Sequence, residues 1–257
     1  SDKSAFRDRY IADERRIANG DELQHRISEL LSRTTRGDTE RGFPTRKTET
    51  VRVTNWSSEE EEMYDRVLVL LRGVYRRHLG NGAPIQRPSG LQEAVSQFVL
   101  TAMLVLREMA SHPAAALKTL GGALGDRVAS LAAINGDTTD VDTVQEFLRE
   151  YEEQALSLPH AKTDKLLRVL KRVLKRTKKA IVYVGFLRTR EALVKRVAEE
   201  FRDLTVLDYY GELDQRSKNR RIEAFQNAKG ACLISMDSGG QGLNLQNADT
   251  LINFDYP

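Results

Sequence analysis

Cysteine is almost absent from this sequence of 257 residues, which contains only Cys232. A disulfide framework and an all-cysteine metal site are therefore excluded. No run of about 18 consecutive apolar residues occurs, so we expect neither a membrane-spanning helix nor a membrane partner. Ser1-Asp2-Lys3-Ser4 contains no apolar stretch and shows no secretory signal. An intracellular, cytoplasmic location fits these absences best.

Charge is divided unevenly along the chain, although the net charge is only +3. Residues 160–257 contain 19 Lys or Arg and 12 Asp or Glu, a net charge of +7, against 21 and 25, a net charge of −4, in residues 1–159. The basic half suits a polyanionic partner, although basic helices are often only solvated faces. The histidines (25, 78, 112 and 160) are dispersed, and we expect no metal site.

The first 159 residues are predicted to be mainly helical. Ser57 and Glu60 have the spacing of a capping box ahead of an apolar run, which predicts a helix from there to about Leu79. Other predicted elements are a charged helix at 1–31, a linker at 33–47, a short strand at 50–54, a helix at 91–110 that Pro113 ends or kinks, a glycine-rich turn near 121–125 and a helix at 144–156.

From His160 onward, apolar strands alternate with helices. The amphipathic pattern at 163–177 predicts a helix, and later helices are expected at 189–201 and 214–226. Apolar runs predict strands at 180–186, 204–208, 231–236 and 250–254. This alternation is typical of an α/β fold with a parallel sheet covered on both faces. Cys232 lies in one of these strands and is expected to be a small buried hydrophobe.

A glycine-rich segment follows the strand at 231–236. Gly239, Gly240 and Gly242 come directly after it, in the sequence Ser238-Gly-Gly-Gln-Gly-Leu-Asn-Leu-Gln246. Glycines let the backbone approach a ligand closely, and loops at the carboxyl ends of parallel strands bind ligands in open α/β sheets. Exposed amides there suit phosphate oxygens, although an ordinary strand-to-helix turn has the same composition.

The ordered set of motifs resembles the second RecA-like lobe of Swi/Snf-type ATPases, within the superfamily 2 helicases. Residues 239–246 are similar to motif V of that family, followed by Asp255-Tyr256-Pro257, and residues 180–186 with Thr189 are similar to motif IV. Tyr210-Gly211 and Lys162 also fit, as do Leu106 to Pro113, Glu62 to Tyr64 and Arg46 to Val53. Residues 111–118 resemble bacterial and archaeal members, a branch that includes the RNA-polymerase-recycling ATPase and phage-defence helicases.

The resemblance implies a division into a connector at 1–55, a helical insertion at 56–159 and a RecA-like, P-loop-NTPase-like lobe at 160–257, truncated before the last motif. It implies that Gly240, Gly242 and Asn244 line the nucleotide cleft. The residues that it places on nucleic acid are Ser235, Ser238, Arg216, Lys218, Arg220 and Arg221. The family has Thr at the position of Met236 and Arg at that of Lys218, so these contacts differ here in detail.

No G-x-x-x-x-G-K-[ST] sequence occurs, so the chain lacks its own P-loop. We therefore expect a fragment without catalytic residues of its own, in which ATP and Mg²⁺ belong to the full-length parent and neither is bound tightly. The expected partners are a first RecA-like lobe in cis and duplex DNA, with RNA or RNA polymerase as alternatives.

Two other functions stay open on the sequence. One is a docking subunit of a polymerase-associated or phage-defence complex, acting through residues 57–160, whose apolar stretch at 95–109 suits either a core or a docking face. The other is a small-nucleotide-binding α/β domain.

The basic helix from Lys165 to Lys179 is expected to be either a solvated face or a phosphate-tracking patch. Trp56 is expected to pack rather than to stack on a base.

Overall fold

The computed structural model describes residues 3–13, 16–30, 47–79, 89–152, 160–236, 245 and 247–255. The chain divides into two compact units, Ser1–Val51 and Arg52–Pro257. Several predicted segments lie outside the described residues, namely most of the linker at 33–47, most of the helix break expected between Gly80 and Gly90, and the glycine-rich segment at 237–244.

The first unit contains α1 (Lys3–Tyr10), β1 (Ile11–Asp13), β2 (Arg16–Ile17) and α2 (Gly20–Leu30). The helical prediction for 1–31 is confirmed at α1 and α2 and is wrong between them, where β1 and β2 form an antiparallel hairpin. Asn19 has a φ of 50°, a left-handed conformation that separates β2 from the start of α2. Glu22 of α2 accepts a hydrogen bond from the Tyr10 hydroxyl at 3.0 Å, which ties the two helices of this unit together.

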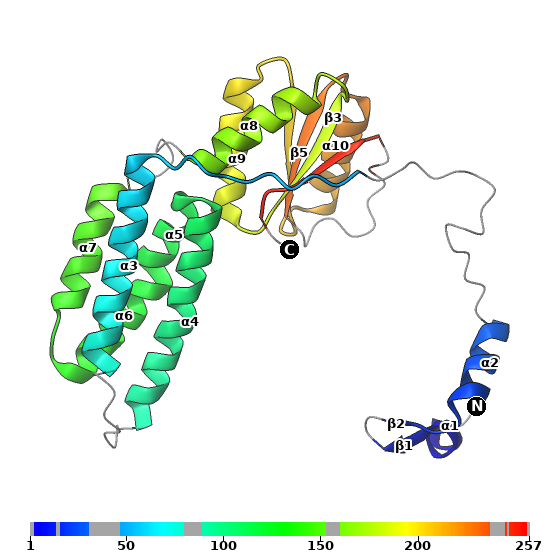
Figure 1. Cartoon of the computed structure of the whole chain (residues 1–257), viewed down its shortest axis with the longest axis horizontal. Helices are drawn as coiled ribbons and strands as arrows, with labels where there is room; N and C mark the ends of the chain where they lie inside the picture. Colours follow the sequence, from blue (N-terminus) through cyan, green and yellow to red (C-terminus); the bar gives the residue numbers. More distant parts are fainter. Residues whose placement is uncertain are drawn as a thin grey trace. The chain divides into compact units, whose positions relative to one another are not determined.

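The second unit begins with a helical bundle (Figure 1). Its helices are α3 (Ser58–Leu79), α4 (Ser89–Ser111), α5 (Pro113–Thr119), α6 (Gly125–Asn135) and α7 (Thr139–Tyr151). The capping box is confirmed, since the Glu60 amide donates to the Ser57 hydroxyl at 3.2 Å and the Ser57 amide donates to the Glu60 carboxylate at 3.1 Å. The core draws on every helix, with Met63, Phe98, Leu131 and Phe147 among its buried members.

Two expectations for the bundle change with the structure. The glycine-rich turn near 121–125 is wrong, because Leu120–Leu124 form a π-helical turn that continues α5 into α6, with Leu120 and Leu124 buried. Gly90–Ser111 of α4 is long and apolar enough to cross a membrane by length and composition alone, contrary to the expectation from the sequence. In this structure one side of α4 packs in the bundle core through Val95, Phe98 and Val105.

The rest of the unit is an α/β lobe with a four-stranded parallel sheet. It contains α8 (Ala161–Val173), β3 (Lys179–Val184), α9 (Leu187–Glu200), β4 (Thr205–Tyr209), α10 (Gln215–Asn227), β5 (Ala231–Met236) and β6 (Thr250–Asn253). The strand order is β4-β5-β3-β6, with Ala180 opposite Cys232 in β5 and opposite Thr250 in β6. The α/β prediction is confirmed. The strand predicted at 50–54 is wrong, because that segment is irregular and extended and pairs with no described strand.

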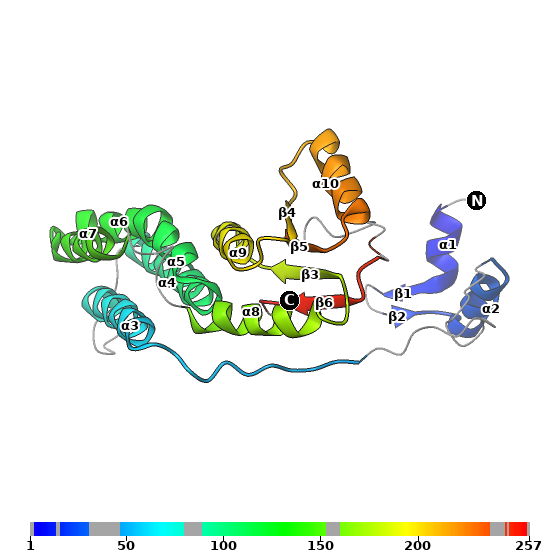
Figure 2. The same cartoon turned by 90° about the horizontal axis from the view of Figure 1, so that it is seen from above.

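Alternation along the strands assigns the helices to opposite faces of the sheet. Val182 and Ile234 point toward Leu170 of α8 and Leu193 of α9. Ile181 and Leu233 point the other way, toward Phe225 of α10. Figure 2 shows this arrangement from above, with α8 and α9 on one side of the sheet and α10 on the other.

Candidate functional site

All four strands of the lobe end at one edge of the sheet, because all are parallel. This carboxyl edge is where open α/β sheets bind ligands. Gly185, Tyr210 and Phe254 follow the ends of three strands there, and the glycine-rich segment follows β5. The predicted residues Ser238, Gly240, Gly242 and Asn244 lie in that segment, outside the described residues. Leu245 and Ala248, which come next, pack into the core beneath α10.

Ser235 is placed near the end of β5 but below the surface. It is 1% exposed, and its hydroxyl donates to the carbonyl of Met236 at 3.2 Å. Its side chain is therefore hydrogen-bonded to the backbone of its own strand.

The four predicted cations of α10 fall into two pairs. Lys218 donates from Nζ to the Gly211 carbonyl at 2.8 Å and holds the turn after β4 against the helix. Arg221 donates from Nε to Asp208 at 2.9 Å and holds β4 itself against the helix. Arg216 and Arg220 are exposed. Asp214 caps the helix by accepting a hydrogen bond from the Ser217 amide at 2.9 Å. Hydrogen bonds from the side chain and the backbone of Ser217 lower the pKa of the Asp214 carboxyl.

Arg190 is a buried cation at this edge that the sequence analysis did not single out. Its guanidinium carbon lies 3.5 Å from the centre of the Tyr210 ring, and Nη1 lies 3.8 Å from Asp208. The residue is 4% exposed, and its Nε and Nη1 atoms have no hydrogen-bond partner among the described residues. Nothing in the spacing of Arg190 along α9 distinguishes it from neighbouring arginines, because its partners come from another strand.

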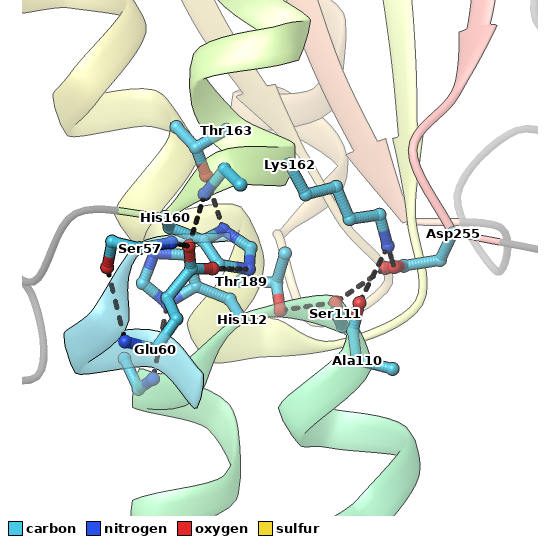
Figure 3. A network of polar contacts seen from close by, with 12 residues as sticks. Ser57, Glu60, Ala110, Ser111, His112, His160, Lys162, Thr163, Thr189 and Asp255 are labelled. Atoms are coloured by element: carbon cyan, nitrogen blue, oxygen red, sulfur yellow. Dashed lines mark hydrogen bonds and ion pairs between the residues drawn. The ribbon is translucent and has the colours of Figure 1, made fainter. Parts of the chain in front are cut away.

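Asp255 joins three segments that are far apart in the sequence. Figure 3 shows its contacts with Ser111 and Lys162. One carboxylate oxygen accepts from the Gly185 amide at 2.8 Å and from the Ser111 hydroxyl at 2.8 Å. The other lies 2.7 Å from Nζ of Lys162, which also donates to the Ala110 carbonyl at 3.1 Å. Ser111 continues the network to Thr189 of α9 at 2.7 Å. The end of α4 is thereby bonded to the carboxyl edge of the sheet.

A second group of polar side chains joins the start of α3 to the start of α8. Oε2 of Glu60 accepts from the Ala161 amide at 2.9 Å, in addition to its capping bond from the Ser57 amide. His160 bonds to the Thr163 hydroxyl at 2.8 Å through Nδ1. The motif residues that carried the family resemblance, Ser111 and Lys162 among them, therefore meet at one junction between bundle and lobe.

Both histidines of the junction are neutral at physiological pH. Burial, together with the nearby charge of Lys162, lowers the pKa of His112 to about 4 and that of His160 to about 3. Their rings lie 4.7 Å apart, a proximity that their spacing in the sequence did not indicate. Within the described ranges, no group of three or more His, Cys, Asp or Glu side chains is arranged to hold a metal ion.

Trp56 packs edge-on against Tyr64 of α3, with ring centroids 5.7 Å apart, as expected for a packing residue. Cys232 is fully buried, also as expected, and burial raises the pKa of its thiol to about 12.

Comparison with known families and proteins places the lobe among helicases. Residues 161–257 match the helicase conserved C-terminal domain. An ATP-dependent RNA helicase, DRS1 of Phaeosphaeria nodorum, is 26% identical over 117 residues, which is 46% of this chain and 14% of that protein. The helicase HAS1 of the same organism is 35% identical over 97 residues, 37% of this chain and 16% of that protein. The chain thus spans a small part of the length of these relatives.

Solved structures with a similar fold match part of the helical region of this chain as well as the lobe. The SWI2/SNF2 ATPase core of Sulfolobus solfataricus in complex with dsDNA matches 98% of this chain and 45% of that one, with 21% identity and a TM-score of 0.50. The Hef helicase domain of Pyrococcus furiosus matches 76% of this chain and 47% of that one, with 18% identity and a TM-score of 0.50.

Proposed function

With a helicase C-terminal domain at residues 161–257 as the premise, we propose that the chain belongs to an ATP-driven translocase of the Swi/Snf type that acts on duplex nucleic acid. In this proposal residues 1–55 are a connector, residues 56–159 an insertion and residues 160–257 the second RecA-like lobe. The observation that carries the proposal is the Asp255 network, which makes the helical bundle and the lobe one bonded body. The fold likeness to the SWI2/SNF2 core across 98% of the chain supports it.

The residues of this chain do not by themselves fit ATP and Mg²⁺. Phosphoryl transfer needs a cation on the phosphates and a carboxylate on the metal, and the sequence has no P-loop to supply the first. We therefore assign the catalytic groups to a first lobe. The second lobe closes against that lobe with its carboxyl edge, where Gly240, Gly242 and Asn244 follow β5.

The nucleic-acid contacts are assigned to exposed cations beside the same edge. Arg216 and Arg220 are exposed in the first half of α10 and suit phosphate oxygens. Lys218 is bonded to the turn after β4 and Arg221 to β4 itself. Lys218 and Arg221 are therefore assigned a positioning role. Ser238 completes the proposed set, whereas Ser235 is buried and its hydroxyl is bonded to the backbone of its own strand.

The test is the ATPase rate of the complete parent protein, with and without duplex DNA or duplex RNA, beside the 257-residue chain alone. We expect a several-fold stimulation of the parent by a duplex and no turnover by the chain. A parent that is inert with both duplexes would refute the motor. An arginine-to-glutamate pair, R216E/R220E, in the parent should weaken duplex stimulation without changing the basal rate.

A second candidate is an RNA helicase that separates strands. Two sequence relatives, DRS1 and HAS1, favour it, since both are RNA helicases by name. Their matches span 37% to 46% of the chain, whereas the likeness to the SWI2/SNF2 core also includes the helical bundle. A strand-separation assay on an RNA duplex distinguishes the two, because a duplex translocase hydrolyses ATP without releasing single strands.

A further inference from the structure

The outward face of α8 is a stripe of cations. Residues three or four apart share one face of a helix, and Leu166, Leu167 and Leu170 are buried against the sheet. The opposite face of α8 and the turn after it carry Lys165, Arg168, Lys171, Arg172, Lys175 and Arg176. The single acidic residue of α8 is Asp164. Amphipathicity alone requires a polar face, but it does not require one that is almost entirely of one charge.

Three cations of this face, Lys165, Arg168 and Lys171, stand apart from the acidic side chains that the structure describes. Among the ion pairs of the described residues, none joins Lys165, Arg168 or Lys171 to a carboxylate. The helix macrodipole favours cations in the last turn, which accounts for Lys171. It does not account for Lys165 and Arg168, which lie in the first two turns, and like charges at this spacing destabilise a helix. The free protein therefore holds these two cations against their mutual repulsion.

A small polar hollow lies at the beginning of the stripe. Residues 52–55 run alongside the first half of α8, and the hollow between them is lined by Arg52, Lys165 and Arg168 together with Thr54 and Asn55. None of the described residues that line it is acidic. Figure 2 shows the extended segment passing along α8 on the side away from the sheet. Two guanidinium groups and an ammonium group around one hollow suit the oxygens of a phosphate.

We propose that Arg52 and the cationic face of α8 bind the phosphodiester backbone of a duplex, at a surface separate from the carboxyl edge. α8 and α10 cover opposite faces of the sheet, so Arg216 and Arg220 cannot belong to this surface. From Lys165 to Arg172 the helix rises about 10 Å, the span of about three successive phosphates on one strand. The inference depends on the proposed function for the identity of its ligand. It adds a second duplex contact to the one proposed at the edge.

The test is fluorescence anisotropy of a labelled DNA duplex, and separately of an RNA duplex, titrated with the 257-residue chain over a range of salt concentrations. The stripe variants are K165E/R168E/K171E and its neutral form K165Q/R168Q/K171Q. The control, K195E/R202E/K229E, reverses three exposed cations elsewhere on the lobe and changes the net charge equally. Circular dichroism and thermal melting verify that each variant folds.

We expect the glutamate stripe variant to lose at least about tenfold in affinity and its salt slope to fall by about 2–3, since each phosphate contact contributes about 0.9. The glutamine variant should lose less affinity, because it removes the charges without reversing them. The control should lose less than about twofold in affinity, because salt screens charges that lie away from the bound duplex. Equal losses in the stripe variant and the control would overturn the inference. Competition by polyglutamate as strong as by unlabelled duplex would also overturn it, in favour of an acidic protein ligand.

R216E/R220E separates this inference from the proposed function. A loss confined to R216E/R220E would refute the α8 surface and leave the proposed edge contact standing. A loss confined to the stripe variant would support the α8 surface and refute the edge assignment. A chain that binds neither duplex would refute both.

Discussion

Replacing Asp255 by alanine should loosen the junction between bundle and lobe. The carboxylate accepts from Gly185 and Ser111 and pairs with Lys162, and its side chain is 11% exposed while that of Lys162 is 23% exposed. A hydrogen bond to a charged group contributes about 1.5–3 kcal/mol, and its loss leaves partners unsatisfied. Because three such contacts share one group they are not additive, and partial exposure reduces the ionic share.

We therefore expect Asp255→Ala to lower the free energy of unfolding by about 2–4 kcal/mol. That corresponds to a fall in melting temperature of about 4–16 °C for a unit of this size. Asp255→Asn keeps an acceptor oxygen for Gly185 but loses the charge opposite Lys162, so its loss should be about half as large.

Urea denaturation monitored by circular dichroism measures these losses, with Asp249→Ala as the control because Asp249 is an exposed acid in the same segment. A double-mutant cycle with Ser111→Ala should give a coupling energy of about 0.5–3 kcal/mol. If Asp255→Ala destabilises no more than Asp249→Ala, or if the coupling is zero, the network does not bind the two parts together.

Other predictions concern the same unit. His112 and His160 have pKa values lowered to about 4 and about 3, below the ordinary 6.5, so their neutral forms stabilise the fold above pH 6.5 and that stability is lost as pH falls below it. At about pH 5 each histidine should lower the free energy of unfolding by about 2 kcal/mol. The urea midpoint of His160→Gln should therefore vary less with pH than that of the wild type. Cys232, buried and with a pKa raised to about 12, should react with a thiol reagent only as fast as the lobe unfolds, so labelling of the native protein on mixing would contradict its placement. Ser57→Ala should cost about 0.5–2 kcal/mol by removing a cap, and Glu60→Ala should cost more because it also leaves the Ala161 amide unpaired; equal losses in thermal melting would argue against the second bond.

Local signals predicted the lobe well because its strands are buried and apolar. Ala180–Val184 and Ala231–Met236 read as strands without any context, and the helices between them show one apolar face. Errors arose where a local signal was ambiguous. The alternation at 50–54 suits a strand, but strand formation also needs a partner, and glycines at 121, 122 and 125 suit a turn as well as a close helix contact.

By itself the sequence determined the α/β class of the lobe, the capping box at Ser57 and the burial of Cys232, since each depends on neighbours within a few residues. It also set the basic character of α8, whose periodicity places the cations on one face. Only the tertiary structure decided that Ser111, Lys162, Gly185 and Asp255 form one network, and that His112 lies beside His160. Hydrogen bonds act over about 3 Å in space, and no spacing along the chain records which distant segments come within that distance.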